Sequence, residues 1–374
     1  MEGIWSDSKV LEAFFSLLRA GLWNTVPDRT SLFPLSSKQW EVIYKTAVNQ
    51  TVVAVVYDGI LNLPEALFPP ESQLLKWVVY TDRIESASKS ADRVVIELTE
   101  YFTDAGLHPI VLKGQGVAQL YDRPNHRECG DIDLYFLTVK ERQQAEALLK
   151  AKGVDFIYNP DNSISYSWEG IQIEQHDHIL DILSPLRKAG VKKIVEECGF
   201  DSVSLCNGKS FKAPSKLLNL LLLNLHAMKH AFGLGIGLRQ ICDIAMAYRA
   251  AYQLASPPMV KDLYKRSCIW RWAQIVHPML IDRIGLPAKM LPFEGPIRKY
   301  DDLFAIIMEG GNFGHHSSDV EGRLTSGRGA VWRRKLATMG AFLKRMSFSL
   351  RLAPGEACWN VIDLVLGQIR KKLK

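Results

Sequence analysis

Closely spaced cysteines are absent from this sequence of 374 residues. A zinc ribbon or a disulfide scaffold needs cysteine pairs at short, regular spacing, so the sequence argues against both classes. The chain has no Cys-x-x-Cys element, and scattered thiols of this kind are typical of a reducing compartment. The cysteines are Cys129, Cys198, Cys206, Cys242, Cys268 and Cys358.

Long apolar runs are absent as well. The most apolar stretch, residues 217–225, is interrupted by Asn219 and Asn224. It is far shorter than the ~20 apolar residues that a membrane-spanning helix needs. The first residues show no basic segment followed by an apolar core, so no signal peptide is expected. These absences predict a cytoplasmic protein without a transmembrane segment.

A strong charge of either sign is also lacking. The formal net charge is +6, and its basic excess gathers near the C-terminal end. That end can meet a polyanionic partner or an anionic surface, but a solvated helical face is the favoured interpretation. No strand alternates basic and aromatic residues in the pattern that stacks bases, so nucleic acid is not expected as a partner.

Length and patterning predict three regions. A single hydrophobic core usually stops growing at about 250–300 residues, so this chain is expected to contain two or three domains. Residues 1–105 have helical spacing throughout, with helices expected over 8–20, 37–61 and 71–104. This region has no cluster of histidine, cysteine or acidic residues that suggests catalysis. Its expected role is packing.

The pattern changes at Pro109, where a predicted α/β core covering residues 106–212 begins. Residues 110–112 suit a buried strand, a glycine turn follows, and a second apolar strand carries Asp131 and Asp133. Residues two apart on a strand face the same side. Two carboxylates this close repel unless a cation neutralises them. A hard divalent ion with oxygen ligands is the usual neutraliser, so the pair predicts a metal site.

A helix and three further strands complete the predicted mixed sheet. In the last strand, alternation places Ile173 on one face and Glu174 and His176 on the other. If this strand lies beside the strand of the two aspartates, Glu174 supplies a third carboxylate. Glu174 can equally be a surface residue, and the residues alone leave both readings open. The helix is expected over 140–151 and the strands over 154–158, 163–168 and 171–178.

The remaining residues, 213–374, are predicted to be helical and to end in a basic tail. A helix over 215–232 places His226 and His230 one turn apart, and Arg239 and Asp243 have the same spacing on the next helix. A zinc site is one reading of the histidines, and it is weaker than a hydrogen-bonded cluster or a group lining a cleft. Farther along, a glycine-rich connection is expected over 309–316, with amphipathic basic helices over 332–350 and 359–373.

Residues 112–136 resemble the polymerase-β-like nucleotidyltransferase superfamily. They contain a Leu-Lys-Gly turn, a short helix-like run ending near Tyr121, Arg127, and the Asp-Ile-Asp strand, and an acidic-x-His strand follows at 174–176. More narrowly, the chain is similar to an uncharacterised branch of that superfamily in which helices precede the transferase core. The resemblance implies an α+β fold: a small mixed β-sheet nucleotidyltransferase core flanked by N-terminal and C-terminal helical regions.

The resemblance also implies a two-metal mechanism that uses Mg²⁺ or Mn²⁺ and an NTP. Asp131 and Asp133 match the family's paired metal ligands, and Glu174 matches its third carboxylate, which can also activate the incoming hydroxyl. The expected nucleotide or phosphate contacts are Lys113, Gly114, Gln115 and Arg127. The side chains expected to line the cleft are His176, His230, Arg239 and Asp243.

Three residues depart from the family pattern or allow more than one role. Gln115 follows Gly114 where the family usually has glycine or serine, which weakens a side-chain hydroxyl contact to phosphate. Arg127 can contact phosphate or brace the aspartate strand, and the brace is slightly favoured. Lys113 can add a charge to the phosphates or point away.

Two hypotheses from different classes follow. The first is a Mg²⁺-dependent nucleotidyltransferase that moves a nucleoside monophosphate from an NTP to a hydroxyl of a small molecule, sugar or protein, releasing pyrophosphate. The second is a non-catalytic nucleotide-binding or regulatory protein that retains the fold. The presence of Asp131, Asp133 and Glu174 together favours the first. The base, the acceptor and the oligomeric state are not specified by the sequence.

Overall fold

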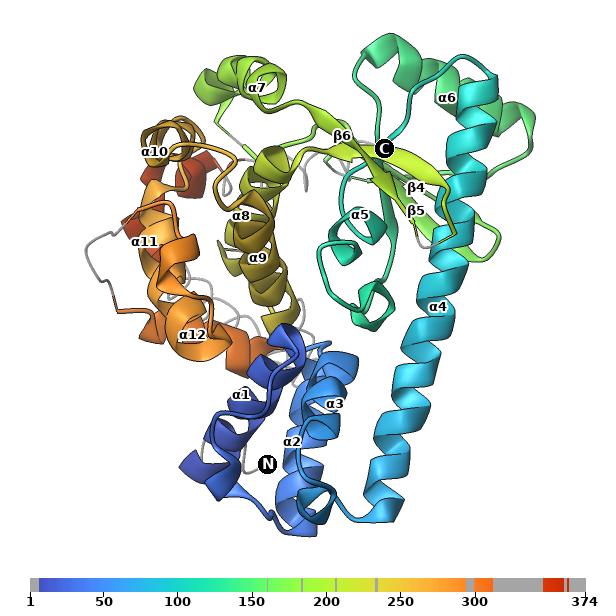
Figure 1. Cartoon of the computed structure of the whole chain (residues 1–374). Helices are drawn as coiled ribbons and strands as arrows, with labels where there is room; N and C mark the ends of the chain where they lie inside the picture. The colour runs from blue at the N-terminus through green and yellow to red at the C-terminus, as the bar shows by residue number, and fades with distance from the viewer. Residues whose placement is uncertain are drawn as a thin grey trace, which may run out of the picture.

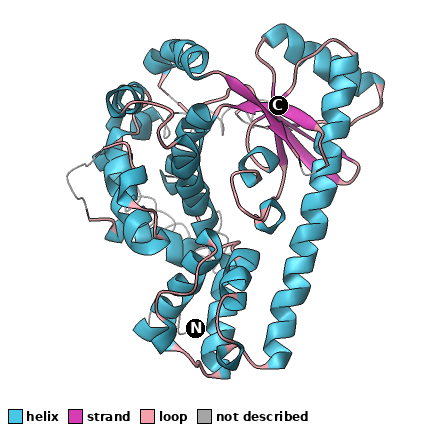
Figure 2. Ribbon diagram, viewed as in Figure 1, coloured by secondary structure: helices cyan, strands magenta, loops and turns pink. Residues whose placement is uncertain are grey.

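The computed structural model describes residues 7–159, 161–182, 184–205, 207–232, 235–293, 299–311, 346–359 and 362. Its elements form a mixed α and β arrangement in which a sheet lies at one end and helices surround it (Figures 1 and 2). The described part thus has the predicted fold class, a mixed sheet flanked by helices on both sides of it in the sequence.

Three helices open the chain: α1 (Ser8–Trp23), α2 (Ser37–Asn49) and α3 (Val53–Leu61). The Asp7 carboxylate caps α1 by accepting from the amide of Lys9, and Ser36 forms a capping box with Gln39 at the start of α2. The prediction of one helix over residues 37–61 was wrong. Thr51 adopts a φ of +52°, a left-handed conformation that no helix interior accepts, and this residue separates α2 from α3.

The helix α4 (Glu71–Asp104) runs for 34 residues without a break and joins the N-terminal helices to the sheet (Figure 1). Such a helix is about 50 Å long. Its first half buries Trp77 and Ile84 in the core of the helical part, whereas Val94 and Phe102 in its second half pack beneath the sheet. One rigid element thus contributes to both hydrophobic cores.

The five-stranded sheet has the order β1-β2-β5-β4-β3. Only β2 and β5 pair in parallel, and the other neighbours are antiparallel. Inward-facing Ile132, Leu134 and Ile173 are buried, as the alternation predicts. The strands are β1 (Ile110–Val111), β2 (Ile132–Tyr135), β3 (Ile157–Tyr158), β4 (Ile164–Trp168) and β5 (Ile171–Gln175).

Several elements connect or extend this sheet. The glycine turn leads into α5 (Gln115–Ala118), and α6 (Val139–Ala151) occupies the place predicted for a helix. Sequence analysis identified neither α7 (Pro185–Cys198) nor the separate two-stranded sheet of β6 (Phe200–Ser204) and β7 (Ser210–Pro214). β6 exposes most of its residues, and β7 interrupts its buried residues with exposed Ser210 and Lys212, so neither strand has the apolar run that marks a buried strand.

The helices that follow pack against α1–α3. One hydrophobic core contains Phe14 of α1, Leu221 of α8 and Trp272 of α11, so the two helical parts are continuous in space. Residues 312–345 lie outside the described residues, and they include most of the loop predicted over 309–316 and of the basic helix predicted over 332–350. Most of the second basic helix, predicted over 359–373, lies outside the described residues as well. The helices are α8 (Lys216–Phe232), α9 (Leu238–Ala251), α10 (Pro257–Arg266), α11 (Trp270–Met279) and α12 (Asp301–Gly310).

No helix within the described ranges combines the length and the apolar character that crossing a bilayer requires.

Two glycines allow α1 and α3 to touch backbone to backbone. A Cβ placed on Gly21 would lie 1.8 Å from the carbonyl oxygen of Val55, and one on Gly59 would lie 2.0 Å from that of Leu17. Distances this short are impossible, so any side chain at either position must push the helices apart.

We therefore expect Gly59→Ala to lower the free energy of unfolding by at least about 2 kcal/mol, because both obstacles are backbone atoms that cannot move aside. Denaturant unfolding measures the change. The matched control is Gly190→Ala on the exposed side of α7, where an added Cβ meets nothing within 4 Å. Alanine has the higher helix propensity, so this control is expected to gain about 0.5–1 kcal/mol. Equal effects at the two positions would contradict the packing argument.

Candidate active site

The parallel pairing of β2 with β5 brings two acidic residues together. Asp133 is the register partner of Glu174, and both side chains leave the sheet on the same face. Asp131 lies directly before β2 and contributes to the same cavity. The two strands are therefore neighbours in this structure, which was the condition for Glu174 to supply a third carboxylate.

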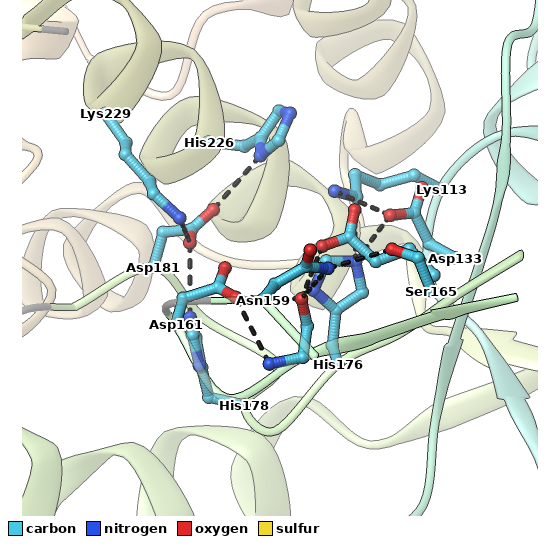
Figure 3. Close-up of polar contacts among 12 residues, drawn as sticks. Lys113, Asp133, Asn159, Asp161, Ser165, His176, His178, Asp181, His226 and Lys229 are labelled. Carbon is cyan, nitrogen blue, oxygen red and sulfur yellow. Dashed lines mark hydrogen bonds and ion pairs between the residues drawn. The ribbon is translucent and has the colours of Figure 1, made fainter. Parts of the chain in front are cut away.

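Two side chains converge on Asp133, the Lys113 ammonium and the His176 imidazole (Figure 3). Its Oδ1 lies 3.0 Å from Lys113 Nζ and 2.5 Å from His176 Nε2. Burial alone would raise the pKa of Asp133, but the Lys113 ammonium and the His176 hydrogen bond outweigh burial and hold the pKa well below its ordinary value. For Asp131 the balance is reversed, because the Asp133 carboxylate and then burial raise its pKa.

Glu174 is held by a second contact on the sheet. The hydroxyl of Ser163 donates to its Oε1 at 2.7 Å, and its Oε2 lies 3.8 Å from His176 Nε2. The imidazole of His176 thus stands between the two carboxylates of the register pair. Asp133, Glu174 and His176 form a group whose potential ligand atoms all lie within 4.8 Å of one another.

The glycine turn approaches this face closely. Gly114 has a φ of +54°, and an added Cβ would lie 3.2 Å from the carbonyl oxygen of Asp131. Glycine therefore allows the turn to pack against the strand that carries the aspartates. The Gln115 side chain is directed elsewhere, since its amide donates to the Ser88 carbonyl at 3.2 Å and to Asp92 on α4. A hydrogen bond to the middle of α4 fixes the position of α5.

Arg127 forms a buried ion pair with α9. Its Nε and its terminal nitrogen each lie 2.7 Å from an oxygen of Asp243, a two-pronged contact that fits guanidinium geometry. The hydroxyl of Tyr121 donates to the same carboxylate at 2.7 Å. Burial alone would lower the pKa of Arg127, but Asp243 outweighs it and raises that pKa well above its ordinary value. The Arg127 side chain thus ties the loop before β2 to the C-terminal helices.

A cavity of about 160 Å³ lies between the sheet and these helices. On the helical side Arg239 donates to the carbonyl of Glu128 at 2.8 Å, which secures the loop again from α9. Of the residues singled out from the sequence, Gln115 and His176 are not part of the cavity lining. Its lining from the sheet side is Lys113, Gly114, Arg127, Gly130, Asp131, Asp133 and Glu174, and from α8 and α9 it is Leu223, His226, His230, Arg239, Gln240 and Asp243.

A second charged cluster adjoins the cavity and was missed in the sequence. Asp181, in the segment after β5, lies 2.7 Å from Lys229 Nζ and 3.0 Å from His226 Nδ1 (Figure 3). His178 Nε2 is 3.3 Å from the same carboxylate. The helical spacing of His226 and Lys229 on α8 was visible in the sequence, but no pattern marks Asp181, which follows the strand in an irregular segment.

A third cluster connects the site loop to the N-terminal helices. His126 lies next to Arg127 and sits between two carboxylates, with Nδ1 2.8 Å from Asp58 and Nε2 2.8 Å from Glu85. Arg123 also contacts Asp58. Only an imidazolium can donate through both ring nitrogens at once, so this arrangement favours the charged form. Burial alone would lower the pKa of His126, and its two carboxylate partners raise it.

Comparison with known proteins identifies the class. A family model described as "Uncharacterised nucleotidyltransferase" matches residues 36–280, more than half of the chain, and this chain belongs to that family. The matched range contains every site residue discussed above. No curated protein matches the chain.

A solved structure gives a weaker comparison. The chain is similar to an antigenic nucleotidyltransferase-like protein from Paracoccidioides brasiliensis at 15% sequence identity. The match covers 55% of this chain and 93% of that chain, with a TM-score of 0.35.

We expect Asp243→Ala to lower the free energy of unfolding by about 3–5 kcal/mol, because the substitution leaves the Arg127 guanidinium buried without its counter-charge. Chemical denaturation measures the loss, with the exposed Asp155→Ala as control. The double variant Arg127→Met with Asp243→Leu should cost less than Asp243→Ala alone, since it buries no unpaired charge. A loss of stability in the double variant that equals the sum of the losses in the two single variants would refute the ion-pair explanation.

His126→Gln tests the cluster that joins the loop to α3 and α4. A histidine whose folded-state pKa exceeds the ordinary ~6.5 adds stability that is fully present below that value and is lost as pH rises through the folded-state pKa. The variant is thus expected to be less stable than the wild type by about 2 kcal/mol near pH 6, with the gap narrowing as pH rises. Denaturant unfolding curves recorded across this pH range measure the difference in free energy of unfolding, with the exposed His108→Gln as reference. A gap that widens with pH would exclude a charged His126.

Proposed function

We propose that this protein is a metal-dependent nucleotidyltransferase that moves a nucleoside monophosphate from an NTP to a hydroxyl of a small molecule, sugar or protein acceptor and releases pyrophosphate. The observation that carries this proposal is the register pair Asp133 and Glu174, with Asp131 on the same cavity and Lys113 beside them. Family membership over residues 36–280 supports the same reaction class.

The side chains at the register pair fit a divalent cation. Asp133 and Glu174 offer carboxylate oxygens and His176 offers a ring nitrogen, all close enough to share one ion. Oxygen ligands suit Mg²⁺, and the added imidazole also suits Mn²⁺. Asp131 lines the same cavity and is the natural ligand for a second ion. Bound there, such ions would neutralise the triphosphate and lower the pKa of the acceptor hydroxyl.

The other polar groups of the cavity suit a phosphate chain. The Lys113 ammonium is largely buried beside Asp133, and burial strengthens its attraction for an anion. When a cation takes over the Asp133 carboxylate, Lys113 is released to bind phosphate oxygens. Gly114 allows a phosphate to approach the backbone of the turn. Arg127 contributes indirectly in this proposal, because its guanidinium is committed to Asp243 and braces the loop.

Phosphoryl transfer asks a protein mainly for positioning and for neutralisation of charge. Residues from three parts of the chain perform these tasks. The sheet supplies the acidic residues, the turn after β1 supplies Lys113, and α8 and α9 form the opposite wall with His226, His230 and Arg239. The acceptor would enter between the sheet and this helical wall.

The direct test is transfer from α-³²P-labelled ATP, GTP, CTP and UTP with Mg²⁺ or Mn²⁺. The acceptors offered are the protein itself, sugars, sugar phosphates and hydroxyl-bearing peptides. Asp133→Asn removes one carboxylate charge from the proposed metal site and should reduce transfer by at least about 10²–10³-fold.

The control variant is Asp155→Asn, which makes the same chemical change at an exposed position with no partner among the described residues. It should retain full activity. Equal signals from the wild type and Asp133→Asn, with both proteins folded, would exclude catalysis at this site and leave a nucleotide-binding or regulatory protein.

A further inference from the structure

His226 stands in the helical wall of the cavity, across from the acidic residues of the sheet. Its Nδ1 lies 3.0 Å from Asp181. Its ring meets that of His230 edge to face, with centroids 4.4 Å apart. His226 is not one of the clustered metal-ligand candidates, which are Asp133, Glu174 and His176. Neither the metal site nor the phosphate contacts therefore account for it.

Asp181 determines which ring nitrogen of His226 carries the proton. Burial alone would raise the pKa of this carboxyl, but Lys229, His178 and His226 outweigh burial and hold the pKa well below its ordinary value. An ionised carboxylate can only accept hydrogen bonds, so Nδ1 must be the protonated nitrogen. The opposite nitrogen, Nε2, then carries a lone pair whenever the ring is neutral.

The ring is neutral at physiological pH in the resting protein. Burial, followed by the nearby Lys113 ammonium, lowers the pKa of His226 to about 4, although Asp181 and Asp133 act in the opposite direction. Next to it, His230 is also uncharged, because burial holds its pKa well below the ordinary value. A bound triphosphate would offset the Lys113 charge and make His226 a stronger base.

Nε2 is available to a ligand. Within the described residues it makes no hydrogen bond, and it is not sealed from solvent. In Figure 3 this nitrogen lies on the side of the ring away from Asp181. A lone pair cannot bind a phosphate oxygen, which also only accepts, so the complement of Nε2 is a donor such as a hydroxyl.

Resting on the proposed nucleotidyl transfer, we propose that His226 is the general base for the acceptor hydroxyl and that Asp181 is its positioning residue. The helical wall of the cavity is then the acceptor side of the site. Glu174 is less suited to this task, because one of its oxygens accepts from Ser163 and the other faces His176 in the ligand group.

The step balances without a further reactant. The acceptor hydroxyl gives its proton to Nε2, and its oxygen forms a bond to the α-phosphorus of the NTP. The bond between that phosphorus and the oxygen bridging to the β-phosphate breaks, and its electron pair leaves with pyrophosphate. Asp181 stabilises the imidazolium that forms, as a carboxylate does for histidine in hydrolases. The proton then passes from His226 to water.

The first experiment needs no substrate. Long-range ¹H–¹⁵N NMR on the full-length chain labelled at histidine identifies the protonated nitrogen of each ring. At pH 7 His226 is expected to be neutral with the proton on Nδ1, and Asp181→Asn should shift its tautomer signature. A charged ring, or a proton on Nε2 in the wild type, would overturn the proposal.

The second experiment uses the NTP and acceptor that give transfer by the wild type. His226→Gln should lower kcat by about 10²–10³-fold while KM for the NTP stays within twofold, because the base acts on the hydroxyl alone. His108→Gln, the same change at an exposed position, should match the wild type.

Each result of the kinetic experiment has one meaning. Added imidazole should partly restore transfer by His226→Gly, which a merely structural role would not allow. Full activity of His226→Gln would overturn the role of His226 and leave the proposed function standing. A wild type that transfers to no acceptor would instead overturn the proposed function and this inference with it.

Discussion

The close approach of two carboxylates on one face of a sheet is the constraint on which the site depends. Parallel pairing of β2 with β5 fixes Asp133 beside Glu174, and their carboxylate oxygens come within 4.8 Å of each other. Like charges at this distance require neutralisation. In this structure the Lys113 ammonium provides it at Asp133, and His176 Nε2 lies 2.5 Å from the same carboxylate oxygen. In the proposed function these carboxylates hold a divalent cation, which would take over that role and release Lys113 for an anionic substrate.

The helices keep the loop before β2 in place. Arg127 reaches Asp243 on α9, and the neighbouring His126 reaches Asp58 on α3 and Glu85 on α4. The loop is thus held from both helical parts, which share one hydrophobic core. This arrangement explains why a small sheet has so much helical structure around it. The helices supply the second wall of the cavity and fix the position of the strand that carries the acidic residues.

Sequence reasoning found the strands of the five-stranded sheet, their inward faces and the acidic residues, because alternation and turn chemistry are local properties. It could not decide whether Glu174 meets Asp133, since strand order is set by the whole fold. The Gln115 side chain was expected at the phosphates, yet it hydrogen-bonds to Ser88 and Asp92 of α4 and does not line the cavity. Asp181 went unnoticed because an aspartate in an irregular segment has no periodic signal. A single left-handed residue, Thr51, divided a helix that the apolar spacing predicted as continuous.

In the proposed function these carboxylates hold a divalent cation together with the phosphates of an NTP. Mn²⁺ is paramagnetic, so electron–nuclear double resonance on the protein with Mn²⁺ and a non-hydrolysable NTP analogue measures directly whether ³¹P nuclei lie in contact with the bound ion. We expect strong ³¹P coupling from Mn²⁺ bound to the wild-type protein, in proportion to the protein present and in excess of the signal from free Mn²⁺–nucleotide. This protein-bound signal should be lost in Glu174→Gln. A wild-type protein that binds no Mn²⁺ in the presence of nucleotide, or binds it unchanged in Glu174→Gln, would contradict the assignment.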